Sequence, residues 1–306
     1  MKHFLIYANE RKDKNLAAAR QIQRYLELKG KHVTLLKNQD SSAGQEPSAE
    51  RACPAGQEPS AGRACPAGQG PSAGQGPPDS CLLVLGGDGT VLQAVREYRH
   101  RALPIIGVNL GTLGYMTEIE MPNLEESLDR LIAGDFVRES RMMLKGMVHF
   151  SHGGSEEGFA LNDIVISRSG SLQIIKFSIY VNGQFLNDYH ADGMIVTTPT
   201  GSTGYNLSAG GPLVEPGARL IMLTPICPHS LNQRSIILSS EDVVDIEIPE
   251  RGEGGVQTVE ASFDASHVVP LETGDRVRIT QWEESAEFLR LDQVSFLEVL
   301  HRKMQG

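Results

Sequence analysis

The chain has 306 residues, of which 40% are hydrophobic and 22% are charged, which is enough for two domains with a sizeable core. Its formal net charge of −10 argues against nucleic acid as the main partner, because a phosphate backbone needs a basic face, although backbone amides can still bind a small anion. The four cysteines show no metal-binding or disulfide spacing, no apolar run is long enough to span a membrane, and the apolar start is too short for a signal peptide. We therefore expect a cytoplasmic protein without a membrane partner.

The first elements alternate between strand and helix. Residues 4–7 form a short apolar run that predicts a buried strand, and residues 33–36 predict a second one. Between them, residues 14–29 predict a helix, because apolar residues recur on one face and Gly30 follows the end. Strand, helix and strand in this order predict the opening of a parallel α/β sheet.

A tandem repeat interrupts this pattern between residues 41 and 78. Residues 43–54 read AGQEPSAERACP, residues 55–66 repeat them with one difference, and a degenerate third copy runs to Pro78. Because the segment is rich in Gly, Pro, Ala and Ser and has no large apolar residue to bury, we predict that it is disordered or loosely extended. We interpret it as an insertion tolerated in a surface loop, since a longer loop costs little free energy. A tether that binds a partner is the alternative.

Ordered elements are predicted again after the repeat. Residues 81–85 are a continuous apolar run, typical of a strand that is covered on both faces. The further expected elements are a helix at 91–98, a strand at 104–108, a helix at 122–133, short alternating strands between 145 and 279, and a helix at 294–300. The fold class expected is an α/β domain followed by a mostly antiparallel β domain.

The loop Gly86-Gly87-Asp88-Gly89-Thr90 lies where an apolar strand ends and a helix begins, which is where ligands bind in open α/β sheets. The three glycines let backbone N–H groups approach an anion closely, and the helix from Thr90 adds its positive N-terminal end. Asp88 is not needed for anion binding, but its carboxylate can accept the proton of an attacking hydroxyl group, as phosphoryl transfer requires. The structural alternative is a turn that uses glycine for positive φ and Asp88 as a helix cap.

Residues 192–212 read DGMIVTTPTGSTGYNLSAGGP, a short apolar strand that runs into small hydroxyl and glycine residues. Such a stretch can line a polar ligand with close backbone contacts, and Tyr205 can stack on a base. A tight turn and a helix capped by Ser202 or Thr203 explain the pattern equally well.

Asn162 and Asp163 come directly before a predicted strand at 164–166. A carboxylate accepts hydrogen bonds from hydroxyls and an amide both donates and accepts them, so the pair can bind the diol of a ribose. Taken alone, the pair is more simply interpreted as a polar turn entering a strand.

Together these segments resemble the NAD kinase family. The matching motifs, in chain order, are GGDGT at 86–90, GVNLGTLGY at 107–115, LNDIVI at 161–166, the whole of 192–212, and PICPHSL at 225–231. They cover most of the chain outside 41–78. The long motif at 192–212 is the specific part, because lipid kinases and phosphofructokinases share the GGDGT loop.

The resemblance implies a Rossmann-like domain at 1–120, a β-rich dinucleotide-binding domain at 121–285 and a C-terminal segment at 286–306 that returns to the first domain. The implied reaction transfers the γ-phosphoryl group of ATP, or of polyphosphate, to the 2′-hydroxyl of the adenosine ribose of NAD, giving NADP. Mg²⁺ or another divalent cation is implied with the donor, without protein residues dedicated to a metal. The implied partners are small-molecule nucleotides and further copies of the chain, as homodimers or homotetramers.

The family's functional residues map onto this sequence position by position. Asp88 resembles the proton acceptor, and Gly86, Gly87, Gly89 and Thr90 resemble the loop that faces the donor phosphates. The positions that resemble NAD contacts are Gly89, Asn162, Asp163, Gln173 (by a loose alignment), His190, Asp192, Thr200, Thr203, Gly204, Tyr205, Asn206, Leu207 and Ser208.

Some positions depart from the family pattern, and two rival functions use the same residues. Asp163 is shorter than the usual Glu, and the turn Asp264-Ala265-Ser266 replaces an Asp-Gly-Gln-like turn, so we expect no ligand contact from Ser266. One rival is a lipid or sugar kinase with the same loop, against which the motif at 192–212 speaks. The other is a non-catalytic NAD(P)-binding regulator, against which Asp88 speaks, since a binder gains little from a carboxylate beside phosphates.

Overall fold

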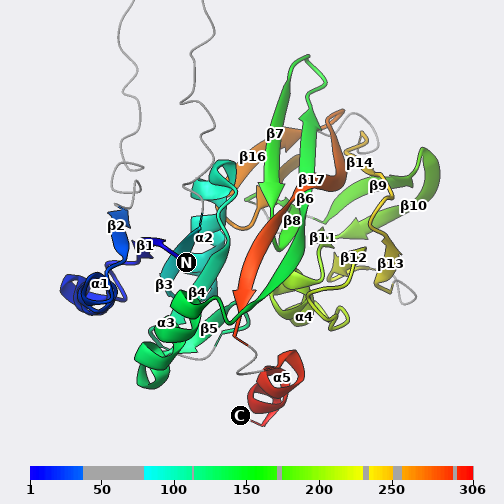
Figure 1. Ribbon diagram of the computed structural model, residues 1–306. Helices are drawn as coiled ribbons and strands as arrows, with labels where there is room; N and C mark the ends of the chain where they lie inside the picture. Colours follow the sequence, from blue (N-terminus) through cyan, green and yellow to red (C-terminus); the bar gives the residue numbers. More distant parts are fainter. Residues whose placement is uncertain are drawn as a thin grey trace, which may run out of the picture.

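The chain is described from a computed structural model that covers residues 1–36, 79–111, 114–170, 174–229, 234–250, 257–291 and 295–305 (Figure 1). The prediction of disorder for 41–78 and the predicted contact of Gln173 lie outside these residues.

A parallel sheet forms the first part of the fold, as the alternation of strands and helices predicts. Its strands, all paired in parallel, are β1 (His3–Ala8), β2 (His32–Leu36), β3 (Ser80–Gly86), β4 (Ile105–Asn109) and β5 (Thr117–Glu120). Every residue of β3 is buried, which agrees with the interpretation of its continuous apolar run as a strand covered on both faces.

Helices cover both faces of this parallel sheet. The helical elements are η1 (Lys14–Leu16), α1 (Ala17–Leu28), α2 (Asp88–Tyr98), η2 (Arg99–Arg101), η3 (Met121–Asn123) and α3 (Leu124–Ala133). Apolar residues of α1 and α3 share one core with one face of the strands, whereas those of α2 share a second core with the opposite face. The arrangement is therefore a sheet between two helical layers.

Two helix starts differ from the sequence prediction. The helix predicted from Lys14 begins as an α-helix only at Ala17, because Asn15 and Leu16 have φ values of 58° and 54°, in the left-handed region. The helix predicted from 91 begins earlier, at Asp88, so the aspartate of the glycine loop lies in the first helical turn.

The parallel sheet continues into the second half of the chain. The added strands are β6 (Val137–His149), β7 (Ser155–Ala160), β9 (Ile175–Val181), β10 (Gln184–Ala191), β14 (Val244–Glu247) and β17 (Arg276–Arg290). Over the described residues this sheet has 11 strands, in the order β10-β9-β14-β17-β4-β3-β1-β2, with β5 beside β4 and β6 between β17 and β7. The parallel pairing of β17 with β4, through Phe288 and Ile105, joins the two halves.

A second sheet, entirely antiparallel, packs on this extension. Its order in the described part of the chain is β13-β12-β11-β8-β15-β16, six strands. They are β8 (Asp163–Arg168), β11 (Gly193–Thr197), β12 (Leu220–Ile226), β13 (Ile236–Ser239), β15 (Thr258–Phe263) and β16 (His267–Glu272), and β11 leads into η4 (Thr200–Thr203) and α4 (Tyr205–Ser208). One apolar core lies between the two sheets. The predicted fold class, an α/β part followed by a mostly antiparallel part, is confirmed.

The last helix, α5 (Phe296–Met304), lies at the lower edge of the view in Figure 1 and contacts the loop that follows β4. The ring of Phe296 lies 6.3 Å from that of Tyr115, and Lys303 Nζ lies 4.5 Å from the centre of the Tyr115 ring. Arg302 pairs with Glu120 at 3.8 Å. Among the described residues, no helix has the length and apolar character needed to cross a membrane.

Candidate active site

The glycine loop joins the end of β3 to the start of α2. Gly87 is the N-cap residue of α2, with extended φ of −135°, and Thr90 donates a 2.8 Å backbone hydrogen bond to its carbonyl. A Cβ on Gly86 would overlap the side chain of Thr90, so only glycine fits there. The first N–H groups of a helix have no partner within the helix, and here they lie at the carboxyl edge of a buried parallel sheet.

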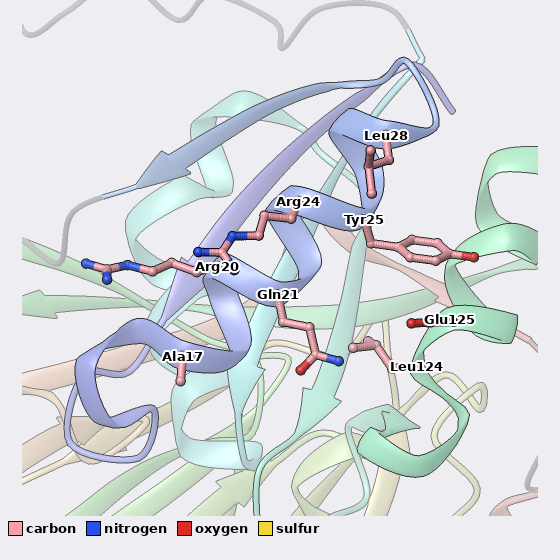
Figure 2. Close-up of a pocket in the computed structure, with 8 residues that line it drawn as sticks. All are labelled: Ala17, Arg20, Gln21, Arg24, Tyr25, Leu28, Leu124 and Glu125. Carbon is pink, nitrogen blue, oxygen red and sulfur yellow. The ribbon is translucent and has the colours of Figure 1, made fainter.

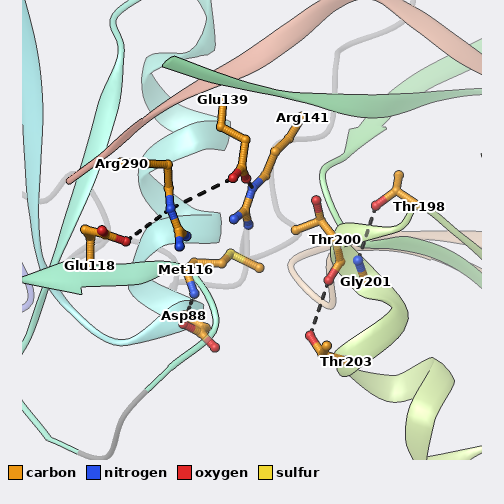
Figure 3. Close-up of polar contacts among 10 residues, drawn as sticks. All are labelled: Asp88, Met116, Glu118, Glu139, Arg141, Thr198, Thr200, Gly201, Thr203 and Arg290. Atoms are coloured by element: carbon orange, nitrogen blue, oxygen red, sulfur yellow. Dashed lines mark hydrogen bonds and ion pairs between the residues drawn. The ribbon is translucent and has the colours of Figure 1, made fainter. Parts of the chain in front are cut away.

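The Asp88 carboxylate does not cap its own helix. Instead, Oδ2 accepts a 2.8 Å hydrogen bond from the backbone N–H of Tyr115. Oδ1 accepts one of 2.9 Å from the backbone N–H of Met116 (Figure 3). A Cβ on Gly114 would overlap this carboxylate, so the glycine makes room for it. The interpretation of Asp88 as a helix cap is therefore wrong, because the carboxylate is used to hold a second loop.

A chain of buried and partly buried ion pairs lies beside this loop and joins three strands (Figure 3). Arg290 lies 3.2 Å from Glu118 and 3.9 Å from Glu139, and Glu139 accepts a 2.6 Å hydrogen bond from Arg141. Arg141 is 1% exposed and its guanidinium lies 4.5 Å from the ring of Phe288. Burial lowers the pKa of Arg141, and the charge of Glu139 opposes that shift. These contacts fix β6 and β17 against β5, which begins just after Met116.

A second carboxylate organises the turn before β8. Asp264 accepts three backbone hydrogen bonds, from Leu161 at 2.7 Å, Asn162 at 2.8 Å and Asp163 at 3.1 Å. Burial raises the pKa of Asp264, and the three N–H donors oppose that rise. The turn carrying Asn162 and Asp163 is thus held from the β15–β16 turn, about one hundred residues further along the chain.

The hydroxyl and glycine stretch after β11 packs directly on the same turn. Thr197 donates its hydroxyl hydrogen bond to the carbonyl of Asn162 at 2.9 Å, and Thr198 donates to that of Leu161 at 2.6 Å. A Cβ on Gly201 would overlap the Asn162 backbone, and one on Gly204 would lie 3.6 Å from Asn162 Nδ2. The structure therefore brings the two motifs together through residues that lie 35 and 37 positions apart in the sequence.

Two buried polar atoms at this junction have no hydrogen-bond partner among the described residues. They are Asn162 Oδ1 and Thr200 Oγ1. Leaving a buried acceptor or hydroxyl unsatisfied costs about 1–3 kcal/mol, so such atoms are expected where a ligand completes the bonding. Both belong to the residues that sequence analysis selected for NAD.

Two ionisable side chains beside them are shifted from their ordinary pKa values. Burial, reinforced by the nearby charge of Asp264, raises the pKa of Asp163 to about 7. Burial also raises the pKa of Tyr205, and Asp192 and Asp163 add to the shift. Tyr205 nevertheless remains 46% exposed, so its ring is accessible to a ligand.

The other predicted contacts differ in what their side chains offer. Asn206 is fully buried, and its amide is occupied inside the protein by the Pro212 carbonyl and by Thr224, at 3.0 and 2.7 Å. Asp192 pairs with Arg168 at 3.0 Å. The remaining members are Thr203, whose hydroxyl donates to the Thr200 carbonyl at 3.4 Å, and the exposed His190, Leu207 and Ser208.

Sequence reasoning missed the organising role of Asp264. It considered this turn only for a contact from Ser266, and the Ser266 hydroxyl in fact donates to the carbonyl of Phe263 within the turn, at 3.1 Å. Asp264 and Ala265 both have positive φ, of 47° and 53°. The sequence sign of this role was an aspartate in a tight turn between strands, but the sequence does not indicate which backbone N–H groups bind it.

The two parts of the site flank one apolar core. Met116, whose N–H binds Asp88, and Leu161, which precedes Asn162, both belong to the core beneath α2. Figure 3 shows Asp88 and Met116 on one side and Thr200, Gly201 and Thr203 on the other. This arrangement can hold a phosphoryl donor at the helix end and a polar acceptor at the opposite turn.

A groove also lies away from these residues, in the described part of the chain. This groove of about 420 Å³ runs between α1 and α3 and is lined by Arg20, Arg24 and Tyr25, among others (Figure 2). None of the residues selected by sequence analysis lines it. For a metal, the described residues contain no group of three His, Cys, Asp or Glu side chains with the spacing of a metal site.

Comparison with known proteins places these features in one family. The family model described as the ATP-NAD kinase N-terminal domain matches residues 4–136, and that of the ATP-NAD kinase C-terminal domain matches residues 161–291. An NAD kinase of Lachnospira eligens is 42% identical over 99% of this chain and 100% of its own length. The chain belongs to the ATP-NAD kinase family. An NAD kinase of Agathobacter rectalis is also similar, at 40% identity over 99% of both chains.

Solved structures of the family share the fold. The crystal structure of yeast NADH kinase complexed with NADH matches with a TM-score of 0.77 at 21% identity, covering 100% of this chain and 88% of that one. An NAD kinase from Archaeoglobus fulgidus in complex with ATP matches with a TM-score of 0.69 at 21% identity, covering 100% and 99%. The family resemblance inferred from the motifs is confirmed.

The raised pKa of Asp163 predicts a pH-dependent cost in stability. The folded state holds the Asp163 proton up to pH about 7, whereas an unfolded aspartate loses it near its ordinary pKa of 3.8. Stability is therefore lost as the pH rises through this window, by about 3 kcal/mol between pH 5 and 8. We expect Asp163→Asn to stabilise the protein more at pH 8 than at pH 5. Denaturant unfolding of both proteins at the two pH values measures this, and an equal difference at both would contradict it.

Proposed function

We propose that this protein transfers the γ-phosphoryl group of ATP to the 2′-hydroxyl of the adenosine ribose of NAD, with Asp88 as the general base. The 2′-oxygen forms a bond to the γ-phosphorus, the bond between that phosphorus and the β,γ-bridging oxygen breaks, and ADP leaves. The hydroxyl proton passes to the Asp88 carboxylate. Family membership supports the reaction and argues against both a lipid or sugar kinase and a non-catalytic regulator.

The position of Asp88 is the observation that supports its role as the general base. Its carboxylate lies in the first turn of α2, beside the N–H groups that can bind phosphate, and faces the loop that follows β4. Each carboxylate oxygen uses one lone pair for a backbone N–H of Tyr115 or Met116, which leaves a second lone pair on each for a hydroxyl. A held carboxylate of this kind needs no reorganisation when the hydroxyl arrives.

The acceptor nucleotide is proposed to bind at the junction of the 161–163 turn and η4. Asn162 and Thr200 offer buried polar atoms without partners, and Asp163 offers a carboxyl for the ribose hydroxyls. The exposed ring of Tyr205 can stack on a base. The remaining contacts proposed from the family resemblance are Gly89, Gln173, His190, Asp192, Thr203, Gly204, Asn206, Leu207 and Ser208.

The donor phosphates are proposed to lie on Gly86, Gly87, Gly89 and Thr90, for ATP and for polyphosphate alike. Mg²⁺ usually binds through phosphates and one or two carboxylates rather than through a dedicated protein cage. We therefore propose that the cation is carried by the donor phosphates. Such a cation offsets phosphate charge when bound.

The assembly and the location of the enzyme are further proposals. The family resemblance supports a homodimer or homotetramer, which sedimentation of the purified protein would show. Two cysteines among the described residues, Cys81 and Cys227, are free thiols, in keeping with the reducing cytoplasm.

Asp88→Asn tests the base assignment. We expect NADP formation to fall by about 100- to 10,000-fold, because Asn cannot take the proton. Asn offers one acceptor oxygen in place of two, so one loop contact is also lost. Calorimetric binding of NAD and the melting temperature distinguish a displaced loop from a missing base. Turnover within about tenfold of wild type would show that another group accepts the proton.

Gly114→Ala tests whether the position of the carboxylate matters as much as its chemistry. The added Cβ overlaps the Asp88 carboxylate, so we expect it to move off the Tyr115 and Met116 amides and turnover to fall about 100-fold. Gly111→Ala is the matched control, because a Cβ on Gly111 meets no atom within 4 Å. Equal kcat values for the two variants would contradict the positioning role of Gly114.

A further inference from the structure

One lysine stands at the glycine loop, although the reaction described above gives it no role. Lys12 lies between β1 and η1, and a Cβ placed on Gly87 would lie 2.9 Å from Lys12 Nζ. The ammonium group therefore lies against the glycine that precedes α2, at the N-terminal end of that helix.

The exposed side chain of Lys12 ends at the positive end of a helix. The N-terminal end of a helix carries a partial positive charge, which repels an ammonium group. In the part of the chain that the structure describes, no carboxylate forms an ion pair with Lys12. This is notable in a chain with a formal net charge of −10, where carboxylates outnumber cationic side chains. An ammonium group, a helix end and glycine amides converging on one point fit a phosphate group.

The loop that carries Lys12 is fastened on both sides. Asn9 N–H donates to the Leu85 carbonyl at the end of β3, at 3.2 Å, and Asn9 Nδ2 donates to Thr90 Oγ1 at 3.4 Å. The backbone N–H of Lys12 in turn donates to the Asn9 carbonyl at 2.9 Å. These contacts tie the lysine backbone to the same strand end and helix turn that form the glycine loop.

The other side of the Lys12 loop is held by Asp13. This side chain is 3% exposed and accepts hydrogen bonds from the N–H groups of Ala18 and Ala19, both at 2.9 Å. The Asp13 carboxylate is thereby committed to the first turn of α1. Asp13 is thus buried and anchors the loop, whereas its neighbour Lys12 lies at the glycine loop.

We propose that Lys12 binds the phosphate groups of the phosphoryl donor. The inference rests on the proposed function, in which those phosphates lie on Gly86 to Thr90. A lysine ammonium is a compact charge with three N–H donors, so it recognises the phosphates and not the adenosine, and it serves ATP and polyphosphate alike. A side chain at Gly87 would require the ammonium group to move away.

Lys12→Met tests the proposal, since it keeps an unbranched apolar stem and removes the charge. We expect the KM for ATP to rise about 10- to 100-fold, as for the loss of a charged hydrogen bond, with the KM for NAD unchanged. Lys14→Met is the matched control, an exposed lysine two residues further along the chain, and it should leave both constants unchanged. Lys12→Arg should keep most of the affinity for ATP.

Binding of inorganic tripolyphosphate, measured by calorimetry without NAD, separates this proposal from the proposed function. Wild type should bind it, and Lys12→Met should bind it about 10- to 100-fold more weakly. Equal binding by the two proteins, or an unchanged KM for ATP, would overturn the role of Lys12. A rise in the KM for NAD alone would overturn it as well, because the ammonium group would then face the acceptor. Failure of wild type to form NADP would instead overturn the proposed function, whatever the tripolyphosphate result.

Discussion

The carboxylate of Asp88, bound to the backbone N–H groups of Tyr115 and Met116, is the contact on which the rest of the site depends. It joins the loop after β3 to the loop after β4, so the two carboxyl ends of neighbouring parallel strands keep one fixed separation. The ring of Tyr115 in turn contacts α5 through Phe296 and Lys303, which connects the end of the chain to the same loop. A single side chain thus sets the geometry of three segments that are far apart in the sequence.

The turn proposed to bind the acceptor is held by the same kind of contact. Asp264 accepts from the backbone N–H groups of the turn that carries Asn162 and Asp163. A carboxylate binds backbone N–H groups more strongly than a neutral acceptor does, because charge-assisted hydrogen bonds are roughly twice as strong as neutral ones. The charge of Asp264 in turn disfavours ionisation of Asp163, whose buried carboxyl has a pKa raised to about 7 by burial and by this charge. The turn that carries the unsatisfied Asn162 oxygen is thus held in shape by the distant carboxylate of Asp264.

The sequence allowed the local elements and the type of chemistry to be predicted, because both depend on neighbouring residues. The apolar run before Gly86, the glycine spacing and the long motif after β11 each identify an element and its function without long-range information. Pairings across long distances could not be predicted in this way. The contact of Asp88 spans 27 residues and that of Asp264 about one hundred, and neither leaves a periodic signal. The late start of α1 also escaped prediction, because Leu16 gives no sequence sign of its left-handed φ.

A crystal structure of the protein with NAD and a non-hydrolysable ATP analogue tests directly whether Asp88 accepts the proton. We expect the ribose 2′-oxygen within about 3 Å of an Asp88 carboxylate oxygen, with the γ-phosphorus on its far side and both hydrogen bonds to Tyr115 and Met116 retained. A 2′-oxygen that instead contacts another basic group, with Asp88 facing only the two amides, would show that the carboxylate builds the loop and does not accept the proton.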